Sequence, residues 1–105
     1  MSKETTVTLQ GASGKMYSFD IYPWGTSFKP LGAIYTVLRK NPPNFQIQYV
    51  GQTDDLSTRF DNHHKQPCFD RNGKTHIAIH LETSEAARFT KESDMVAQYN
   101  PMCNG

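Results

Sequence analysis

The sequence has few cysteines, little net charge and no long hydrophobic run. Its only two cysteines, Cys68 and Cys103, lie far apart and form no CxxC pair. Neither a disulfide framework nor a structural zinc site is therefore indicated, and we expect two reduced thiols. No apolar run approaches the roughly twenty residues that span a bilayer, and residues 1–6 carry no signal-peptide core. We therefore expect a cytoplasmic protein with no membrane partner.

The formal net charge is only +1, in a chain of 105 residues of which 36% are hydrophobic. A strongly basic surface is the signature of a protein that coats nucleic acid, and this composition does not provide one. The length is enough for a single hydrophobic core and too short for a second domain. The chain should therefore form one compact domain.

Runs of β-favouring residues predict two hairpins and a further strand. We expect strands over residues 7–10, 16–22, 31–38, 45–50 and 75–81. Gly11–Gly14 would turn the first hairpin, and the Asn41-Pro42-Pro43-Asn44 segment would turn the second. In the connector between the hairpins, Trp24 and Phe28 are expected to pin the chain to the core.

The segment from Tyr49 to His63 reads as the end of a strand, a tight glycine turn at Gly51, and a helix over residues 54–65 capped by Thr53 or Asp54. On such a helix Arg59 and His63 would share one face. A guanidinium and an imidazole one turn apart suit phosphate recognition and proton transfer.

A second helix is expected from Ser84, its N-cap, to the Asn100-Pro101 stop. Phe89, Val96 and Tyr99 would form its apolar stripe. Glu92 falls in the same stripe, so this helix would aim a carboxylate at the interior. A buried charge of this kind is costly unless a cation or a metal ion meets it.

Several short motifs, taken in order, resemble those of the GIY-YIG nuclease family. The segments that carry the resemblance are Gly32-Ala33-Ile34-Tyr35, Tyr49-Val50-Gly51, Leu56 with Arg59 and His63, Glu92, and Pro101 with Asn104. The match covers residues 31–105, which would be the catalytic domain, and residues 1–30 would be an added hairpin and connector.

The resemblance implies an α+β fold: a small sandwich with a central three-stranded antiparallel sheet flanked by helices, plus the N-terminal β-hairpin. It also implies hydrolysis of DNA phosphodiester bonds with one Mg²⁺ or Mn²⁺ ion. Tyr35 and Tyr49 would line the pocket, Arg59 would hold the scissile phosphate, and Glu92 would bind the metal. The family has a histidine or tyrosine at the position of His63 and an asparagine at that of Asn104.

The reaction itself needs fixed positive charge on the phosphate, a metal ligand and a base for the attacking water. Arg59 supplies a guanidinium that stays charged, and Glu92 supplies the hard oxygen that magnesium prefers. A tyrosine hydroxyl beside a cation could have a lowered pKa and act as the base, and Tyr35 and Tyr49 are equal candidates. Gln52 stands where some members have a lysine.

Arg39, Lys40, Gln52 and Lys65 are the expected contacts to nucleic acid, with DNA as the first substrate and RNA as the second. The alternative function is a module that binds nucleic acid or protein on the same scaffold with little or no turnover. In either case the N-terminal hairpin would be the interface for a second copy or a partner protein.

Overall fold

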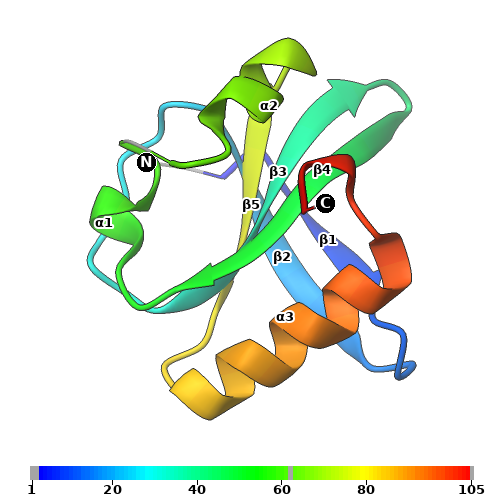
Figure 1. The fold of residues 1–105 in the computed structure, drawn as a ribbon, viewed down its shortest axis with the longest axis vertical. Coiled ribbons are helices and arrows are strands. Elements are labelled where there is room, and N and C mark those ends of the chain that lie inside the picture. Colours follow the sequence, from blue (N-terminus) through cyan, green and yellow to red (C-terminus); the bar gives the residue numbers. More distant parts are fainter. Residues whose placement is uncertain (1–2, 62, 105) are drawn as a thin grey trace.

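Five strands form one antiparallel sheet in the computed structural model, which describes residues 3–61 and 63–104 (Figure 1). The strand order across the sheet is β1-β2-β5-β3-β4. The bounds are β1 Thr5–Gln10, β2 Met16–Pro23, β3 Ala33–Asn41, β4 Asn44–Thr53 and β5 His76–Leu81. Each predicted strand is confirmed, as are the two hairpin turns.

The predicted N-terminal β-hairpin is confirmed, but the central sheet has five strands and not three, because this hairpin extends it. β2 pairs with β5, with Ile21 opposite Ala78, and β5 in turn pairs with β3. Alternate β2 residues Tyr17, Phe19 and Ile21 are buried, so β2 offers a complete apolar face to the core. The coarser prediction of an α+β fold is confirmed.

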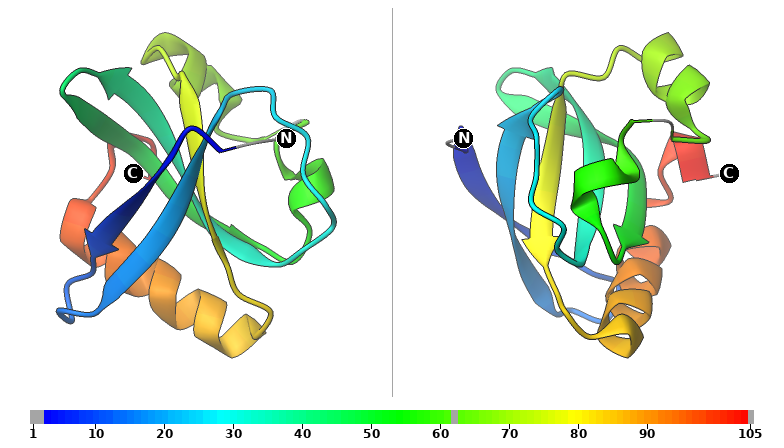
Figure 2. Two further views of the ribbon diagram at one scale, coloured as in Figure 1. Left: turned by 180° about the vertical axis from the view of Figure 1, so that it is seen from behind. Right: turned by 90° about the vertical axis from the view of Figure 1, so that its left-hand side faces the viewer.

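The two faces of the sheet are covered differently (Figure 2). Helix α3 (Glu85–Tyr99) lies on one face, over a core that includes Phe19, Ile34 and Val50. We call this the α3 face. The opposite face carries Tyr35 and Tyr49 and is covered by α1 (Leu56–Arg59), α2 (Gln66–Arg71) and the connector after β2. We call it the tyrosine face.

Polar contacts join α3 to the hairpin tip, so that the sheet curls around the helix. The carboxylate of Asp94 accepts hydrogen bonds from the hydroxyl groups of Ser13 and Tyr17, both at 2.6 Å. The predicted N-cap is confirmed, because the Ser84 hydroxyl accepts from the backbone N–H of Ala87. Helix α3 ends at Tyr99, as the Asn100-Pro101 stop predicts.

The predicted stripe of α3 is partly wrong. Phe89 is 50% exposed, whereas Arg88 and Met95 are buried. Arg88 and Met95 each lie one position before an expected member of the stripe, and Glu92 still lies on the same side of the helix. Val96 and Tyr99 are half-buried against the same core.

The predicted helix over residues 54–65 is also wrong. Helix α1 has only four residues, and Asp55 caps it by accepting from the backbone N–H of Ser57. The next helix, α2, begins at Gln66, with Pro67 in its first turn instead of after its end. Proline fits there because the first backbone N–H groups of a helix have no partner within it.

A disulfide joins Cys68 in α2 to Cys103 in the short 3₁₀ helix η1 (Met102–Asn104). The expectation of two reduced thiols is therefore wrong. The sequence separation of 35 residues gave no local spacing that could reveal the pair. The bond holds the carboxy-terminal segment against the tyrosine face beside Phe69.

Candidate active site

Tyr35 and Tyr49 lie side by side on the tyrosine face, with ring centroids 6.0 Å apart. A β-bulge in β4 makes this possible. Val37 pairs with Tyr49 but Leu38 pairs with Ile47, so Gln48 is an extra residue. Simple alternation would place Ile47 and Tyr49 on the same face, whereas the bulge turns Tyr49 to the opposite one. Bulges often re-aim a side chain in this way beside functional sites.

Gly51 makes room for these two rings. A Cβ atom at this position would lie 2.5 Å from the hydroxyl oxygen of Tyr35 and 2.7 Å from Cε2 of Tyr49. Gly51 lies inside β4 opposite Tyr35, so the expected tight glycine turn is wrong. The sequence needs glycine here for close approach, not for an unusual backbone path.

The hydroxyl of Tyr35 is the centre of a hydrogen-bond network. Arg59 Nε donates to it at 2.8 Å, and His63 Nε2 lies 2.7 Å from it. The backbone N–H of Lys65 donates to His63 Nδ1, so Nδ1 carries no proton. His63 is therefore the neutral tautomer that donates from Nε2 to Tyr35. Arg59 and His63 do converge as predicted, but His63 lies outside α1 and does not share a helix with Arg59.

Burial controls the protonation of this network. Burial and the nearby Arg59 lower the pKa of His63 to about 4, with smaller contributions from His64 and Lys65. Burial also raises the pKa of both Tyr35 and Tyr49, and the positive charge of Arg59 only partly opposes it. The protein's own residues therefore do not lower the pKa of either tyrosine, contrary to the prediction.

Two predicted site residues lie along the outer edge of β4. Asn104 uses both ends of its amide on Val50: Oδ1 accepts from its N–H at 2.9 Å and Nδ2 donates to its carbonyl at 2.8 Å. The carboxylate of Glu92 accepts from the backbone N–H of Gln52, the next outward-facing residue. Asn104 is thus a clamp on the strand that carries Tyr49.

Glu92 lies close enough to Arg59 and the two tyrosines for their charges to influence one another. It is half-buried, and burial raises the pKa of its carboxyl group, opposed by the Gln52 hydrogen bond and the charge of Arg59. The negative charge of Glu92 in turn helps to raise the pKa of Tyr35 and Tyr49. The side chain on α3 therefore faces the group on the tyrosine face across the edge of β4.

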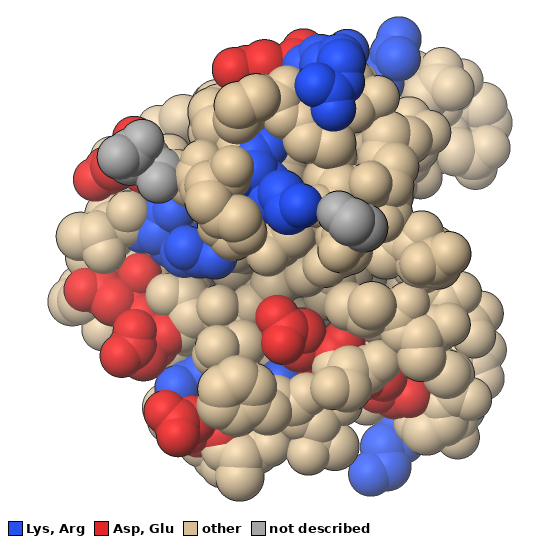
Figure 3. Space-filling view, in the orientation of Figure 1, with Lys and Arg blue, Asp and Glu red and all other residues tan. Residues whose placement is uncertain are grey.

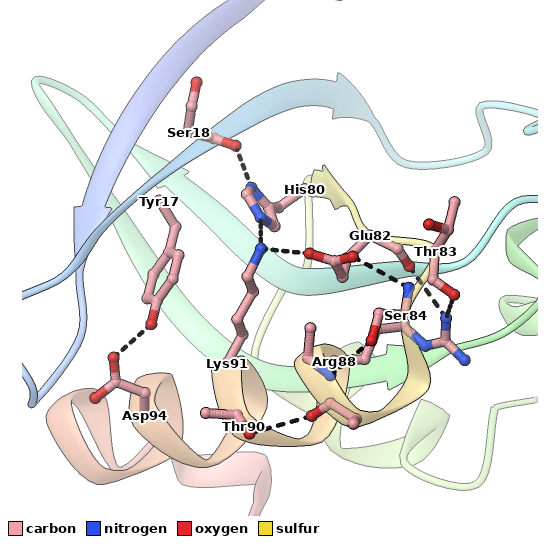
Figure 4. Close-up of polar contacts among 12 residues, drawn as sticks. Tyr17, Ser18, His80, Glu82, Thr83, Ser84, Arg88, Thr90, Lys91 and Asp94 are labelled. Carbon is pink, nitrogen blue, oxygen red and sulfur yellow. Dashed lines mark hydrogen bonds and ion pairs between the residues drawn. The ribbon is translucent and has the colours of Figure 1, made fainter.

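Sequence reasoning missed Arg88, which is only 4% exposed. Its Nε donates to Gln52 Oε1 at 3.1 Å. Its Nη1 donates to the carbonyl oxygens of Glu82 and Thr83 (Figure 4). A signal was available, because Arg88 lies four residues before Glu92 and so shares its helix face. Arg88 was not predicted because it falls outside the expected stripe of Phe89, Glu92, Val96 and Tyr99.

The residues predicted to contact nucleic acid are dispersed. Arg39 and Lys40 lie near the turn of the β3–β4 hairpin, away from Tyr35, and Lys40 approaches Glu4 at 3.9 Å. Lys65 follows His63, and the amide oxygen of Gln52 is taken by Arg88. Basic and acidic side chains are mixed over this side of the molecule (Figure 3). Of the four, only Gln52 and Lys65 lie beside the site.

The donor set at the site limits how a metal could be held. Within residues 3–61 and 63–104, no three His, Cys, Asp or Glu side chains gather as ligands. Glu92 is a single hard oxygen donor whose charged form is disfavoured by burial. A Mg²⁺ or Mn²⁺ ion beside it would stabilise that form, and would need substrate oxygens and water to complete its coordination. The residues therefore fit a metal that binds together with a phosphate.

Comparison of the chain with family models, with curated proteins and with solved structures found no match. The resemblance described above therefore depends on the sequence motifs alone. In the part of the chain that the structure describes, no helix is long and apolar enough to cross a membrane.

Proposed function

We propose that the protein is a metal-dependent nuclease that hydrolyses phosphodiester bonds in DNA, with RNA as a second substrate class, by GIY-YIG-type chemistry. The observation that supports this is that four of the predicted site residues lie near one another. Tyr35, Tyr49, Arg59 and Glu92 come from four different elements and interact with one another at one edge of the sheet. A buried network of this kind around a phosphate-binding arginine is typical of a catalytic site.

In this proposal Arg59 binds the scissile phosphate and stabilises the charge that develops on it. Its Nε is held by Tyr35, which is fully buried and therefore acts by positioning the guanidinium. Glu92 would hold the Mg²⁺ or Mn²⁺ ion, which would supply Lewis acidity to the phosphate and the attacking water. Tyr49 is the tyrosine with surface exposure, 8% against 0% for Tyr35, and is the better candidate to contact that water.

The alternative is a module that binds nucleic acid or protein without turnover. The raised pKa of Tyr49 favours it, because a tyrosine of this kind is a poor base unless a cation lies beside it. The half-buried carboxylate of Glu92 favours the metal-dependent nuclease, because it would repel a phosphate unless a metal ion lay between them.

A plasmid-nicking assay with and without Mg²⁺ distinguishes the two. The wild-type protein should nick only with the metal, and Arg59→Ala and Glu92→Gln should each lose at least about a hundredfold in rate. Glu4→Gln makes the same chemical change far from the site and is the matched control. Full activity in the two site variants would refute the site, and no cleavage of any DNA or RNA by the wild type would favour the binding module.

A further inference from the structure

Next to the tyrosine pair is an open pocket of about 360 Å³. It lies between the end of β4, α1 and the first turns of α3. Its lining residues are Gln52, Thr53, Asp54, Arg59, Glu85 and Arg88. Two arginines from different helices therefore meet in one pocket, and neither tyrosine lines it.

The hydrogen bonds of Arg88 fix its guanidinium but leave one nitrogen available. Nε and Nη1 are bound to the amide oxygen of Gln52 and to two backbone carbonyls, as described above. Figure 4 shows the guanidinium beneath the turn formed by Glu82 and Thr83. Among the described residues, none accepts a hydrogen bond from Nη2. The free donor therefore belongs to a side chain whose orientation is already set.

The charge of this buried arginine is not compensated by the protein. All three acceptors of Arg88 are neutral, and within residues 3–61 and 63–104 neither Arg88 nor Arg59 forms an ion pair with Asp or Glu. Burying a guanidinium without a counter-charge is costly. An anion in the pocket would offset that cost, and the planar arginine fork matches the oxygens of a phosphate.

We propose that Arg88 binds a non-scissile phosphate of the nucleic-acid strand, next to the phosphate held by Arg59. The inference rests on the proposed function, because the phosphate that it places in the pocket is the one next to the phosphate that would be cleaved. Arg59 belongs both to the pocket lining and to the tyrosine network, so a single nucleic-acid strand can extend from one to the other. The exposed carboxylates of Asp54 and Glu85 at the pocket limit how tightly the anion binds.

The test measures binding and not cleavage. A fluorescently labelled oligonucleotide duplex is titrated without divalent metal, over a series of salt concentrations, against wild type and Arg88→Gln. We expect Arg88→Gln to bind about tenfold more weakly and the salt slope to fall by about one. Arg88→Lys, which keeps the charge, should recover most of the slope. Arg71→Gln removes an exposed charge in α2, outside the pocket, and should leave affinity nearly unchanged.

Arg88→Gln also removes hydrogen bonds that hold the turn before α3, so Glu85→Gln tests the pocket without touching them. Loss of this exposed carboxylate should tighten binding by a factor of about two to three. Three outcomes would overturn the inference: affinity and salt slope of folded Arg88→Gln equal to those of Arg71→Gln, no change in Glu85→Gln, or Arg88-dependent binding of inorganic phosphate but not of the duplex.

The assay also separates this inference from the proposed function. Arg88-dependent binding by a wild-type protein that never cleaves would refute the nuclease and retain the phosphate site. Metal-dependent cleavage with binding that does not depend on Arg88 would refute the phosphate site alone.

Discussion

The two faces of the sheet are equally well buried but are built from different chemistry. Under α3 the core consists mostly of aliphatic and aromatic side chains, such as Phe19, Ile34 and Val50, and its buried members include one ionisable group, Tyr17. On the tyrosine face, Tyr35 and His63 are just as inaccessible to solvent and carry polar atoms that must find partners. One face is suited to stability and the other to a preorganised site.

The difference shows what the tyrosine face requires of the sequence. A bulge at Gln48, a glycine at position 51 and a disulfide under α2 are all found on or beside it. The bulge orients Tyr49, the glycine leaves space for the Tyr35 hydroxyl, and the disulfide tethers a segment that has only short helices. Departures from regular structure therefore gather where the site is.

The largest expected effect on stability comes from the α3 face. Phe19 is completely buried, and Phe19→Ala should lower the free energy of unfolding by about 3–5 kcal/mol. At a temperature where the variant is still folded, its affinity for DNA should equal that of the wild type. Urea denaturation and the duplex titration measure the two quantities, and a parallel loss of both would mean that the faces are not separable.

A smaller, pH-dependent effect comes from His63. Its pKa is about 4 in the folded protein against 6.5 as the reference value, so on acidification the unfolded chain takes up the proton first. The stabilising contribution is complete above about pH 6.5, and roughly 3 kcal/mol is lost as the pH falls to about 4. The stability difference between wild type and His63→Gln should shrink across this window. A difference that is constant with pH would contradict the assignment of a buried neutral imidazole.

The smallest of the three effects on stability is expected for Tyr35→Phe. This change keeps the ring but leaves Arg59 Nε and His63 Nε2 without their acceptor, at a cost of about 1–3 kcal/mol. Because Arg59 loses its anchor, cleavage should fall by roughly a hundredfold, far more than the stability change suggests. Thermal melting and nicking rates test this, with Tyr22→Phe as the matched control. Equal nicking by the Tyr35 and Tyr22 variants would refute the positioning role.

The strands and the cap of α3 could be predicted from the sequence because their signals are local. Alternation in residues 16–22 and the serine before Glu85 act over a few residues, and the structure confirms both. The predicted helix over residues 54–65 failed because tertiary contacts outweighed helical spacing. His63 is buried against Tyr35 and Tyr49, a position that a continuous helix through Arg59 does not provide.

Other parts of the site depend on contacts between distant segments. The disulfide between Cys68 and Cys103, the clamp of Asn104 on Val50 and the bulge at Gln48 have no signature at short range. The motif order placed Arg59 and Glu92 at one site, but it did not predict that the Glu92 carboxylate would accept a hydrogen bond from Gln52 at the edge of β4.

The most direct test of the central proposal is the dependence of the cleavage rate on Mg²⁺ concentration in wild type, Glu92→Gln and Glu4→Gln. If Glu92 holds the catalytic metal beside Arg59, wild type and Glu4→Gln should give the same saturating curve, whereas Glu92→Gln should stay near the background rate. Three coincident curves would contradict it.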